Sequence, residues 1–199
     1  MSESSFELLD QLNSELAAVV GMAQRSLVKI QNGRSGAGAG TIIHPDGLII
    51  TNAHVVGSKR LKVTLWDGES LKGRIVAVDR KMDLAAVSVD AKDLPTLKIV
   101  GRRQIQPGQW VAALGHPWGV NGAVTAGTII AIGSPVERLP YEGELIQAGL
   151  RLRPGHSGGP MLNKDGGLVG INMMITGPEV GLAVPAESVK KFLKQALGS

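Results

Sequence analysis

The stretch Gly155-His156-Ser157-Gly158-Gly159-Pro160 decides how the rest of the chain is interpreted. Glycine stands two residues before Ser157 and at both positions after it, and this spacing predicts a backbone so tight that only glycine tolerates it. Such a turn can direct several backbone N–H groups at one point beside the serine hydroxyl. An acyl-transfer site needs those donors, because negative charge develops on the carbonyl oxygen. The alternative is a glycine-rich hairpin loop with a surface serine, in a chain with 27 glycines among 199 residues.

A serine nucleophile needs a base, and the base needs a group that orients it. Of four histidines, His54 follows the apolar run Leu48-Ile49-Ile50, which predicts an imidazole at the end of a buried strand. Asp83 lies among apolar residues, where a carboxylate has to be paired or hydrogen-bonded, and a histidine N–H is a natural partner. The order His54, Asp83, Ser157 is the chain order of the chymotrypsin group.

Three motifs together carry a family resemblance: Thr51-Asn52-Ala53-His54-Val55-Val56, Met82-Asp83-Leu84-Ala85 and Pro154-Gly155-His156-Ser157-Gly158-Gly159-Pro160. With them the chain resembles the trypsin-like fold, and specifically the HtrA/Deg family of serine proteases. The resemblance extends from about Leu27 to Pro185. It implies a serine endopeptidase that cleaves unfolded or exposed protein segments in protein quality control, and it implies a homotrimer. The alternative is a catalytically silenced binding or chaperone module on the same fold.

The resemblance also assigns roles to residues of this chain. Ser157 is expected to be the nucleophile, His54 the general base, and Asp83 the group that fixes the tautomer of His54. The N–H groups of Gly155 and Ser157 are expected to form the oxyanion hole. His156 stands where the family usually has asparagine. Its side chain is expected to face solvent or a neighbouring loop, with a pH-sensitive gate on the oxyanion turn as the alternative.

The primary substrate pocket is expected from the residues before the nucleophile and from a later strand. These residues are Arg151, Leu152, Asn172, Met173 and Met174. The apolar members and the family resemblance predict cleavage after Val, Ala or Ile, and no acid is present to favour Lys or Arg. Arg151 either turns outward, because an unpaired buried guanidinium is costly, or lies at the pocket floor and favours Asp or Glu.

Sequence periodicity predicts an all-β protein with two barrels and a helix at each end. Apolar residues recur every three or four positions near the N-terminus, and the period changes to two from Leu27. Short alternating runs separated by turn signals such as Asp46-Gly47 then predict the strands of a closed barrel. The expected divisions are a helical segment over 1–24, a six-stranded antiparallel barrel over 25–95, a connection over 96–108, a second such barrel over 109–185 and a helix over 186–199.

Three local expectations are more specific. Ser4 or Ser5 is expected to cap the N-terminal helix. The segment from Gly33 to Gly40 is expected to be a Gly/Ser loop. Residues 124–132 are expected to form a pair of strands, with a bend or bulge at Gly127.

Composition excludes several classes of protein. The net charge is +4, from 21 Lys and Arg against 17 Asp and Glu, and the basic residues are mostly scattered. Nucleic-acid binding needs a clustered basic surface and is not expected. The chain has no cysteine, so disulfides cannot stabilise it. No metal site is expected, because the histidines lack the spacing of metal ligands. No cofactor is expected either.

The N-terminal residues lack the features of a secretion signal. Four acidic residues precede the short apolar run from Leu16 to Ala23, and no stretch approaches the ~20 apolar residues of a membrane span. The chain as written is expected to be cytoplasmic, with a periplasmic or other extracytoplasmic location after removal of a leader as the alternative. The HtrA/Deg family usually carries PDZ modules after the protease domain, and none is expected within this chain.

Overall fold

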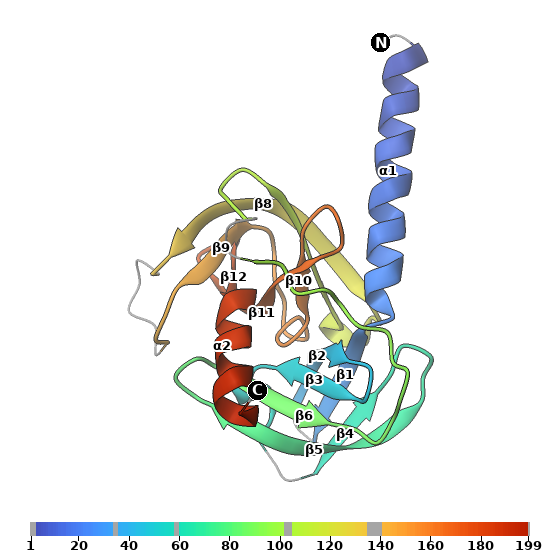
Figure 1. Ribbon diagram of the computed structural model, residues 1–199. Coiled ribbons are helices and arrows are strands. Elements are labelled where there is room, and N and C mark those ends of the chain that lie inside the picture. Colours follow the sequence, from blue (N-terminus) through green and yellow to red (C-terminus); the bar gives the residue numbers. More distant parts are fainter. Residues whose placement is uncertain (1–2, 34–35, 58–59, 102–104, 135–140, 199) are drawn as a thin grey trace.

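Two closed antiparallel barrels of six strands each form the body of the protein, and a helix lies at each end of the chain (Figure 1). The structure is a computed structural model that describes residues 3–33, 36–57, 60–101, 105–134 and 141–198. This architecture confirms the predicted fold class. The alternation of apolar and polar residues produces it, since every second side chain of a strand faces the inside of its barrel.

The first barrel has the strand order β1-β2-β3-β6-β5-β4. Its strands are β1 (Leu27–Asn32), β2 (Gly36–His44), β3 (Leu48–Thr51), β4 (Leu61–Thr64), β5 (Ser70–Asp79) and β6 (Leu84–Ser88). A one-turn 3₁₀ helix, η1 (Ala53–Val55), follows β3 directly. The β2–β3 turn contains Gly47 with φ +82°, as its Asp-Gly sequence predicts.

The second barrel has the order β10-β11-β12-β9-β8-β7. Its strands are β7 (Trp110–Gly115), β8 (Ala123–Gly133), β9 (Leu145–Gly149), β10 (Pro160–Leu162), β11 (Leu168–Thr176) and β12 (Val180–Pro185). A second one-turn helix, η3 (Pro117–Gly119), follows β7. Aliphatic side chains from all of these strands fill the barrel, in keeping with an aromatic content of only 3%.

The expectation of a loop from Gly33 to Gly40 is wrong in its second half, because β2 begins at Gly36. The small residues pair with β1 from Asn32↔Gly36 to Val28↔Gly40. Larger side chains would not fit there: a Cβ on Gly40 would lie 2.7 Å from a methyl group of Ile49. Close packing inside the barrel therefore selects glycine in a strand that composition alone assigns to a loop.

The region predicted as a pair of strands is one strand of eleven residues, β8. Its irregularity lies between Ile129 and Ala131 rather than at Gly127. Gly127 instead permits a close approach of backbones, since a Cβ there would lie 1.9 Å from the carbonyl oxygen of Gly149. The expected bend or bulge at Gly127 is therefore wrong, and the glycine is explained by its close contact with β9.

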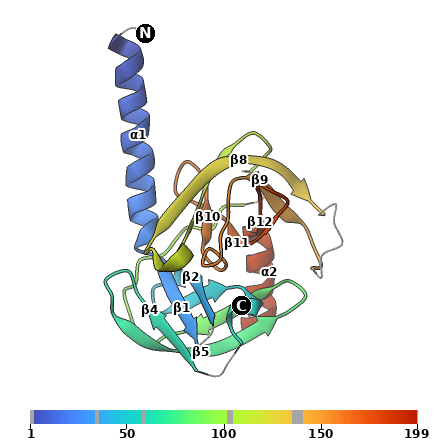
Figure 2. The same ribbon diagram turned by 180° about the vertical axis from the view of Figure 1, so that it is seen from behind.

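The N-terminal helix α1 (Glu3–Gln24) projects away from the barrels and contacts them near its C-terminal end (Figures 1 and 2). It begins before Ser4, so the predicted cap at Ser4 or Ser5 is wrong. The C-terminal helix α2 (Ala186–Leu197) follows Pro185 and packs on β11, β12 and β6. Within the described part of the chain, neither helix is long and apolar enough to cross a membrane.

The two barrels meet through hydrogen bonds that join β2 to the Ser157 turn. The N–H of Ala39 donates to the carbonyl oxygen of Ser157 at 2.8 Å, and the hydroxyl of Thr41 donates to that of Gly158 at 3.2 Å. A Cβ on Gly158, where φ is +86°, would lie 2.1 Å from the carbonyl oxygen of Ala39. The glycine after the serine is therefore needed for the barrels to touch at this turn.

Candidate active site

His54 and Asp83 come from separate elements of the first barrel and contact each other. His54 lies on η1, just beyond β3, and Asp83 immediately precedes β6. The Nδ1 atom of His54 lies 2.8 Å from Oδ2 of Asp83, and the backbone N–H of His54 donates to Oδ1 at 3.1 Å. The carboxylate thus fixes both the ring and the backbone of the histidine. The other ring nitrogen, Nε2, remains available to a reacting group.

Asp83 has a left-handed backbone, with φ +46°. A non-glycine residue in this region costs of order 1–3 kcal/mol and persists only where its surroundings impose it. Asn52 provides one such constraint, because its fully buried Nδ2 donates to the carbonyl oxygen of Asp83 at 3.0 Å. Asn52 also directly precedes η1, so one residue connects the backbone of Asp83 to the turn that carries His54. Its role was not predicted from the sequence.

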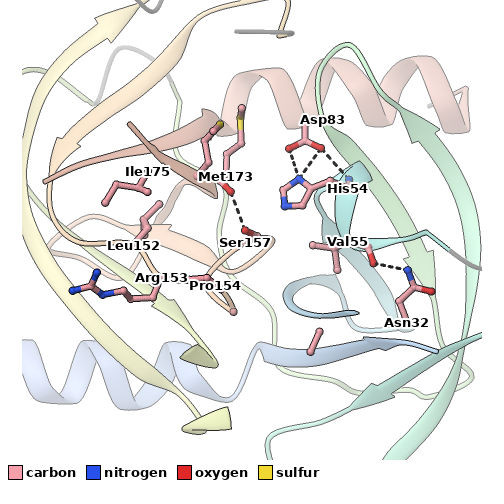
Figure 3. A pocket seen from close by; sticks show the side chains of 13 residues that line it. Asn32, His54, Val55, Asp83, Leu152, Arg153, Pro154, Ser157, Met173 and Ile175 are labelled. Carbon is pink, nitrogen blue, oxygen red and sulfur yellow. Dashed lines mark hydrogen bonds and ion pairs between the residues drawn. The ribbon is translucent and has the colours of Figure 1, made fainter. Parts of the chain in front are cut away.

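The Ser157 hydroxyl points across the same cavity but does not bond to the histidine. Its Oγ donates to the carbonyl oxygen of Met173 at 2.9 Å, and Figure 3 shows the side chain directed to that carbonyl rather than to the ring of His54. Ser157 and His54, both described residues, make no hydrogen bond to each other. Rotation about χ1 of Ser157 is the change that would bring Oγ toward the imidazole, and such contacts often tighten only when substrate binds.

Asn172 supports the Ser157 turn from behind rather than lining the cavity. Its carbonyl oxygen accepts from Gly158 N–H and its N–H donates to Gly159, both at 2.9 Å. Its side-chain Nδ2 donates to the carbonyl oxygens of Leu114 and Pro160 at 3.0 and 3.1 Å. The residue is completely buried. The structure therefore places Asn172, predicted in the pocket wall, among the supports of the Ser157 turn.

The turn before Ser157 presents two free donors. His156 N–H bonds to the carbonyl oxygen of Arg153 at 2.9 Å, which closes a tight turn with Gly155 at φ +106°. Such turns require a residue with positive φ at this position, hence glycine. Among the described residues, the N–H groups of Gly155 and Ser157 have no acceptor. Both residues line the cavity that contains His54, so these donors are available to an oxyanion.

The cavity has a volume of about 500 Å³ and lies between the barrels (Figure 3). Leu152, Met173 and Met174 line it together with the three residues of the expected triad. Arg151 does not line it, because its Nε donates to Glu179 at 2.9 Å in an ion pair whose two side chains are 59% and 60% exposed. Arg153 does line the cavity, and its guanidinium lies 5.6 Å from the ring centre of Trp118.

His156 is buried, so the expectation that its side chain faces solvent is wrong. Only 3% of the residue is exposed, and its Nδ1 accepts from Arg153 N–H at 3.1 Å. Burial lowers the pKa of His156. His116 lies nearby, and burial together with the charge of Lys29 lowers its pKa to about 4. The backbone N–H of His116 donates to the carbonyl oxygen of Gly155 at 2.8 Å, so both histidines adjoin the turn before Ser157.

These two histidines predict a loss of stability in acid. An unfolded histidine binds a proton below about pH 6.5, whereas folded His116 stays neutral until about pH 4. Since the unfolded state binds more protons over this interval, the free energy of unfolding falls as pH falls through it. We expect His116 to contribute about 1–2 kcal/mol of this loss, because partial solvation reduces the full effect. Urea titrations between pH 7.5 and 4 measure it.

The matched variants for this test are His116→Gln and His44→Gln. His44 lies at the end of β2 with 56% of its side chain exposed. We expect the dependence of the urea midpoint on pH to flatten in His116→Gln and to be retained in His44→Gln. Equal slopes in the two variants would show that His116 does not contribute to the acid response.

Comparison with known proteins gives the class of this protein. The family described as the trypsin-like peptidase domain matches residues 38–171, which include all three residues of the expected triad. The chain therefore belongs to the trypsin-like peptidase family. Among solved structures it is similar to an HtrA-type protease, an AlgW variant with a tripeptide, with a TM-score of 0.85 and 28% identity. That match covers 90% of this chain and 62% of the other.

Within this family the chain is similar to HtrA and Deg proteases, as the motifs predicted. A probable periplasmic serine endoprotease DegP-like of Halomonas elongata is 44% identical over 77% of this chain and 34% of its own length. The putative serine protease HhoB of Synechocystis is 39% identical over 78% of this chain and 39% of its own length. Serine protease HTRA1 of Xenopus laevis is 36% identical over 80% of this chain and 36% of its own length. The matched region thus spans little more than a third of these relatives' length.

Proposed function

We propose that the protein is a serine endopeptidase that cleaves unfolded or exposed protein segments in protein quality control. The observation that carries this proposal is the arrangement around one cavity. A carboxylate-bound imidazole, a serine hydroxyl and two unpaired backbone N–H groups face the same space of about 500 Å³. The relatives named serine proteases support the reaction class. The relatives named periplasmic serine endoproteases support an extracytoplasmic location.

The first half of the proposed reaction forms an acyl-enzyme. Oγ of Ser157 attacks the peptide carbonyl carbon while Nε2 of His54 takes the hydroxyl proton. The carbonyl oxygen becomes an oxyanion and accepts hydrogen bonds from the N–H groups of Gly155 and Ser157. The C–N bond then breaks, and His54 returns the proton to the leaving amine. Asp83 stabilises the imidazolium that exists between these two proton transfers.

The second half releases the product by the same proton transfers with water as nucleophile. His54 takes a proton from water, the resulting hydroxide adds to the acyl carbon, and the ester bond to Oγ breaks. Ser157 regains its proton from His54. Before the first step the Ser157 hydroxyl has to leave the carbonyl of Met173, because its proton occupies that bond in the structure. Substrate binding along the Met173 segment is the step that we expect to release it.

The alternative function, a silenced binding or chaperone module, draws support from this same Ser157–Met173 bond. Covalent labelling by a fluorophosphonate and cleavage of unfolded casein separate the two functions. We expect labelling at Ser157 together with casein fragments. A stable complex with casein, without labelling and without fragments over hours, would establish the silenced module instead.

The pocket wall predicts cleavage after small and medium aliphatic residues. Leu152, Met173 and Met174 offer an apolar surface that adapts to its occupant, and Arg151 is paired with Glu179 outside the cavity. Exposed ion pairs contribute little, so we expect Arg151→Ala to change the cleavage pattern and rate by less than about twofold. Sequencing the fragments of a reduced, unfolded substrate measures both. Cuts mainly after Asp or Glu, lost in Arg151→Ala, would overturn this prediction.

We propose that α1 mediates assembly into a homotrimer. Large apolar side chains are exposed along its N-terminal half: Phe6 53%, Leu8 67%, Leu9 48% and Leu12 50%. This half of the helix projects away from the barrels, which leaves that surface uncovered (Figure 2). We expect light scattering to give the mass of a trimer for the full chain and of a monomer after removal of residues 1–11. Equal masses for both chains would contradict a role of this segment.

A further inference from the structure

A second cavity, of about 460 Å³, lies at the base of α1, remote in sequence from the serine turn. It is lined by the end of α1, by β1, by the end of β4 with the turn after it, and by residues on both sides of η3. Its lining includes Arg25, Lys29, Trp66 and His116. In Figure 2 the lower end of α1 lies where β1 and the beginning of β8 come together. The volume of this cavity is in the range of small-molecule sites.

Lys29 is distinguished from the other cations by its burial. It is half-buried on β1, whereas every other lysine and arginine that the structure describes is exposed. Its ammonium has no acceptor or carboxylate partner among the described residues, and no acidic residue lines the cavity. By contrast, exposed cations such as Lys81 have acidic partners. Partial burial of an unpaired charge is unfavourable, and an anion in the cavity would relieve that cost.

The remaining walls add a second cation and an apolar surface. The guanidinium of Arg25 lies 5.2 Å from the ring centre of Trp66, in a cation–π contact. This contact uses the flat face of the guanidinium, so the N–H groups along its edge can bind a carboxylate. Leu27, Leu65 and the half-exposed indole of Trp66 form the apolar part of the lining. Two cationic side chains beside an apolar wall suit an amphipathic anion better than an inorganic one.

His116 connects this cavity to the oxyanion turn. Its side chain lines the cavity, and its Nδ1 accepts from Gly122 N–H at 3.3 Å. On the other side, its backbone N–H donates to Gly155, and a Cβ on Gly155 would lie 2.5 Å from its carbonyl oxygen. The backbone of His116 is therefore packed directly against the glycine that presents one of the two free N–H groups.

We propose that this cavity binds a carboxylate carried on an apolar or aromatic body, with Lys29 and Arg25 as its cationic partners, and that binding changes the environment of Gly155 through His116. The site stands independently of the proteolytic function, because neither Lys29 nor Arg25 has a role in the reaction proposed above. The carboxylate belongs either to a free organic acid or to the C-terminus of a polypeptide.

The test uses the full 199-residue chain and NMR titration. The probes are 3-phenylpropionate and its uncharged amide, and the tripeptide Ala-Ala-Phe with a free or an amidated C-terminus. We expect the carboxylates to shift the indole N–H of Trp66 and the ring protons of His116 saturably, and the amides to bind at least tenfold more weakly. The pKa of His116 is expected to rise on binding, since the ligand neutralises the charge of Lys29 that lowers it. Tighter binding of 3-phenylpropionate would identify the ligand as a free organic acid, and tighter binding of the tripeptide would identify it as a polypeptide C-terminus.

Variants assign the binding to this cavity. Lys29→Met keeps an unbranched side chain of nearly the same length and removes its charge, and we expect it to weaken binding about ten- to hundredfold. Lys29→Arg should retain binding within a few-fold, and Lys62→Met, at an exposed lysine on β4, should not change it. Equal affinity of acid and amide, or unchanged affinity in Lys29→Met, would overturn the site. Binding without a parallel shift of the Gly155 amide resonance would overturn the connection to the oxyanion turn. Neither outcome depends on protease activity.

Discussion

Replacement of Ser157 by alanine is expected to abolish turnover and leave the fold intact. Loss of the nucleophile in a serine protease lowers kcat by about 10⁶, because the remaining groups cannot form the acyl-enzyme. Within the described part of the chain, the hydroxyl makes a single hydrogen bond, to the carbonyl oxygen of Met173. Its removal should therefore change the free energy of unfolding by only about 0.5–1.5 kcal/mol. Casein cleavage and urea denaturation measure the two effects on the same preparation.

The matched control is Ser14→Ala. Ser14 lies on the exposed part of α1, where its hydroxyl donates to the carbonyl oxygen of Asp10 at 2.8 Å, so the same atom is deleted far from the cavity. We expect Ser14→Ala to retain full cleavage and fluorophosphonate labelling, and Ser157→Ala to lose both. Cleavage by Ser157→Ala at the rate of the unaltered chain would remove this serine from the mechanism.

The fold could be predicted from the sequence because local pattern and global architecture agree over most of the chain. Alternating runs such as Leu61 to Leu65 became barrel strands with their apolar residues buried. The exception is β2, whose first five residues are all glycine or alanine. Their strand conformation depends on pairing with β1 and on the space left by Val55 and Ile49, and neither is visible in the local sequence.

The candidate site could be predicted in part. The motifs identified three side chains that line one cavity, although they lie 29 and 74 positions apart in the sequence. The supporting residues could not be assigned, because a buried asparagine is recognised only by what surrounds it. Asn52 belongs to the His54 motif and Asn172 was predicted in the pocket wall, yet their hydrogen bonds reach residues 31 and 58 positions away. The direction of the Ser157 hydroxyl is likewise set by the distant Met173.

Asp83→Asn is expected to lower kcat/KM by about 10⁴ without unfolding the protein. Asp83 accepts from Nδ1–H of His54, which leaves Nε2 unprotonated and able to take the Ser157 proton. An asparagine amide can instead donate to Nδ1, which places the ring proton on Nε2 and removes the base. Asparagine also tolerates the left-handed conformation at φ +46° better than most residues, so the backbone should be retained. Cleavage rates for a peptide substrate measure the loss.

A matched control exists at Asp93, which also has a left-handed backbone, at φ +55°, and lies on the surface outside the cavity. Asp93→Asn makes the same chemical change in the same conformation and is expected to leave kcat/KM unchanged. Asp83→Asn should still react with the fluorophosphonate, but more slowly in proportion to its lost turnover, because the same base activates Ser157 in both reactions. Retention of more than about a tenth of the activity in a folded Asp83→Asn chain would show that the carboxylate does not set the tautomer of His54.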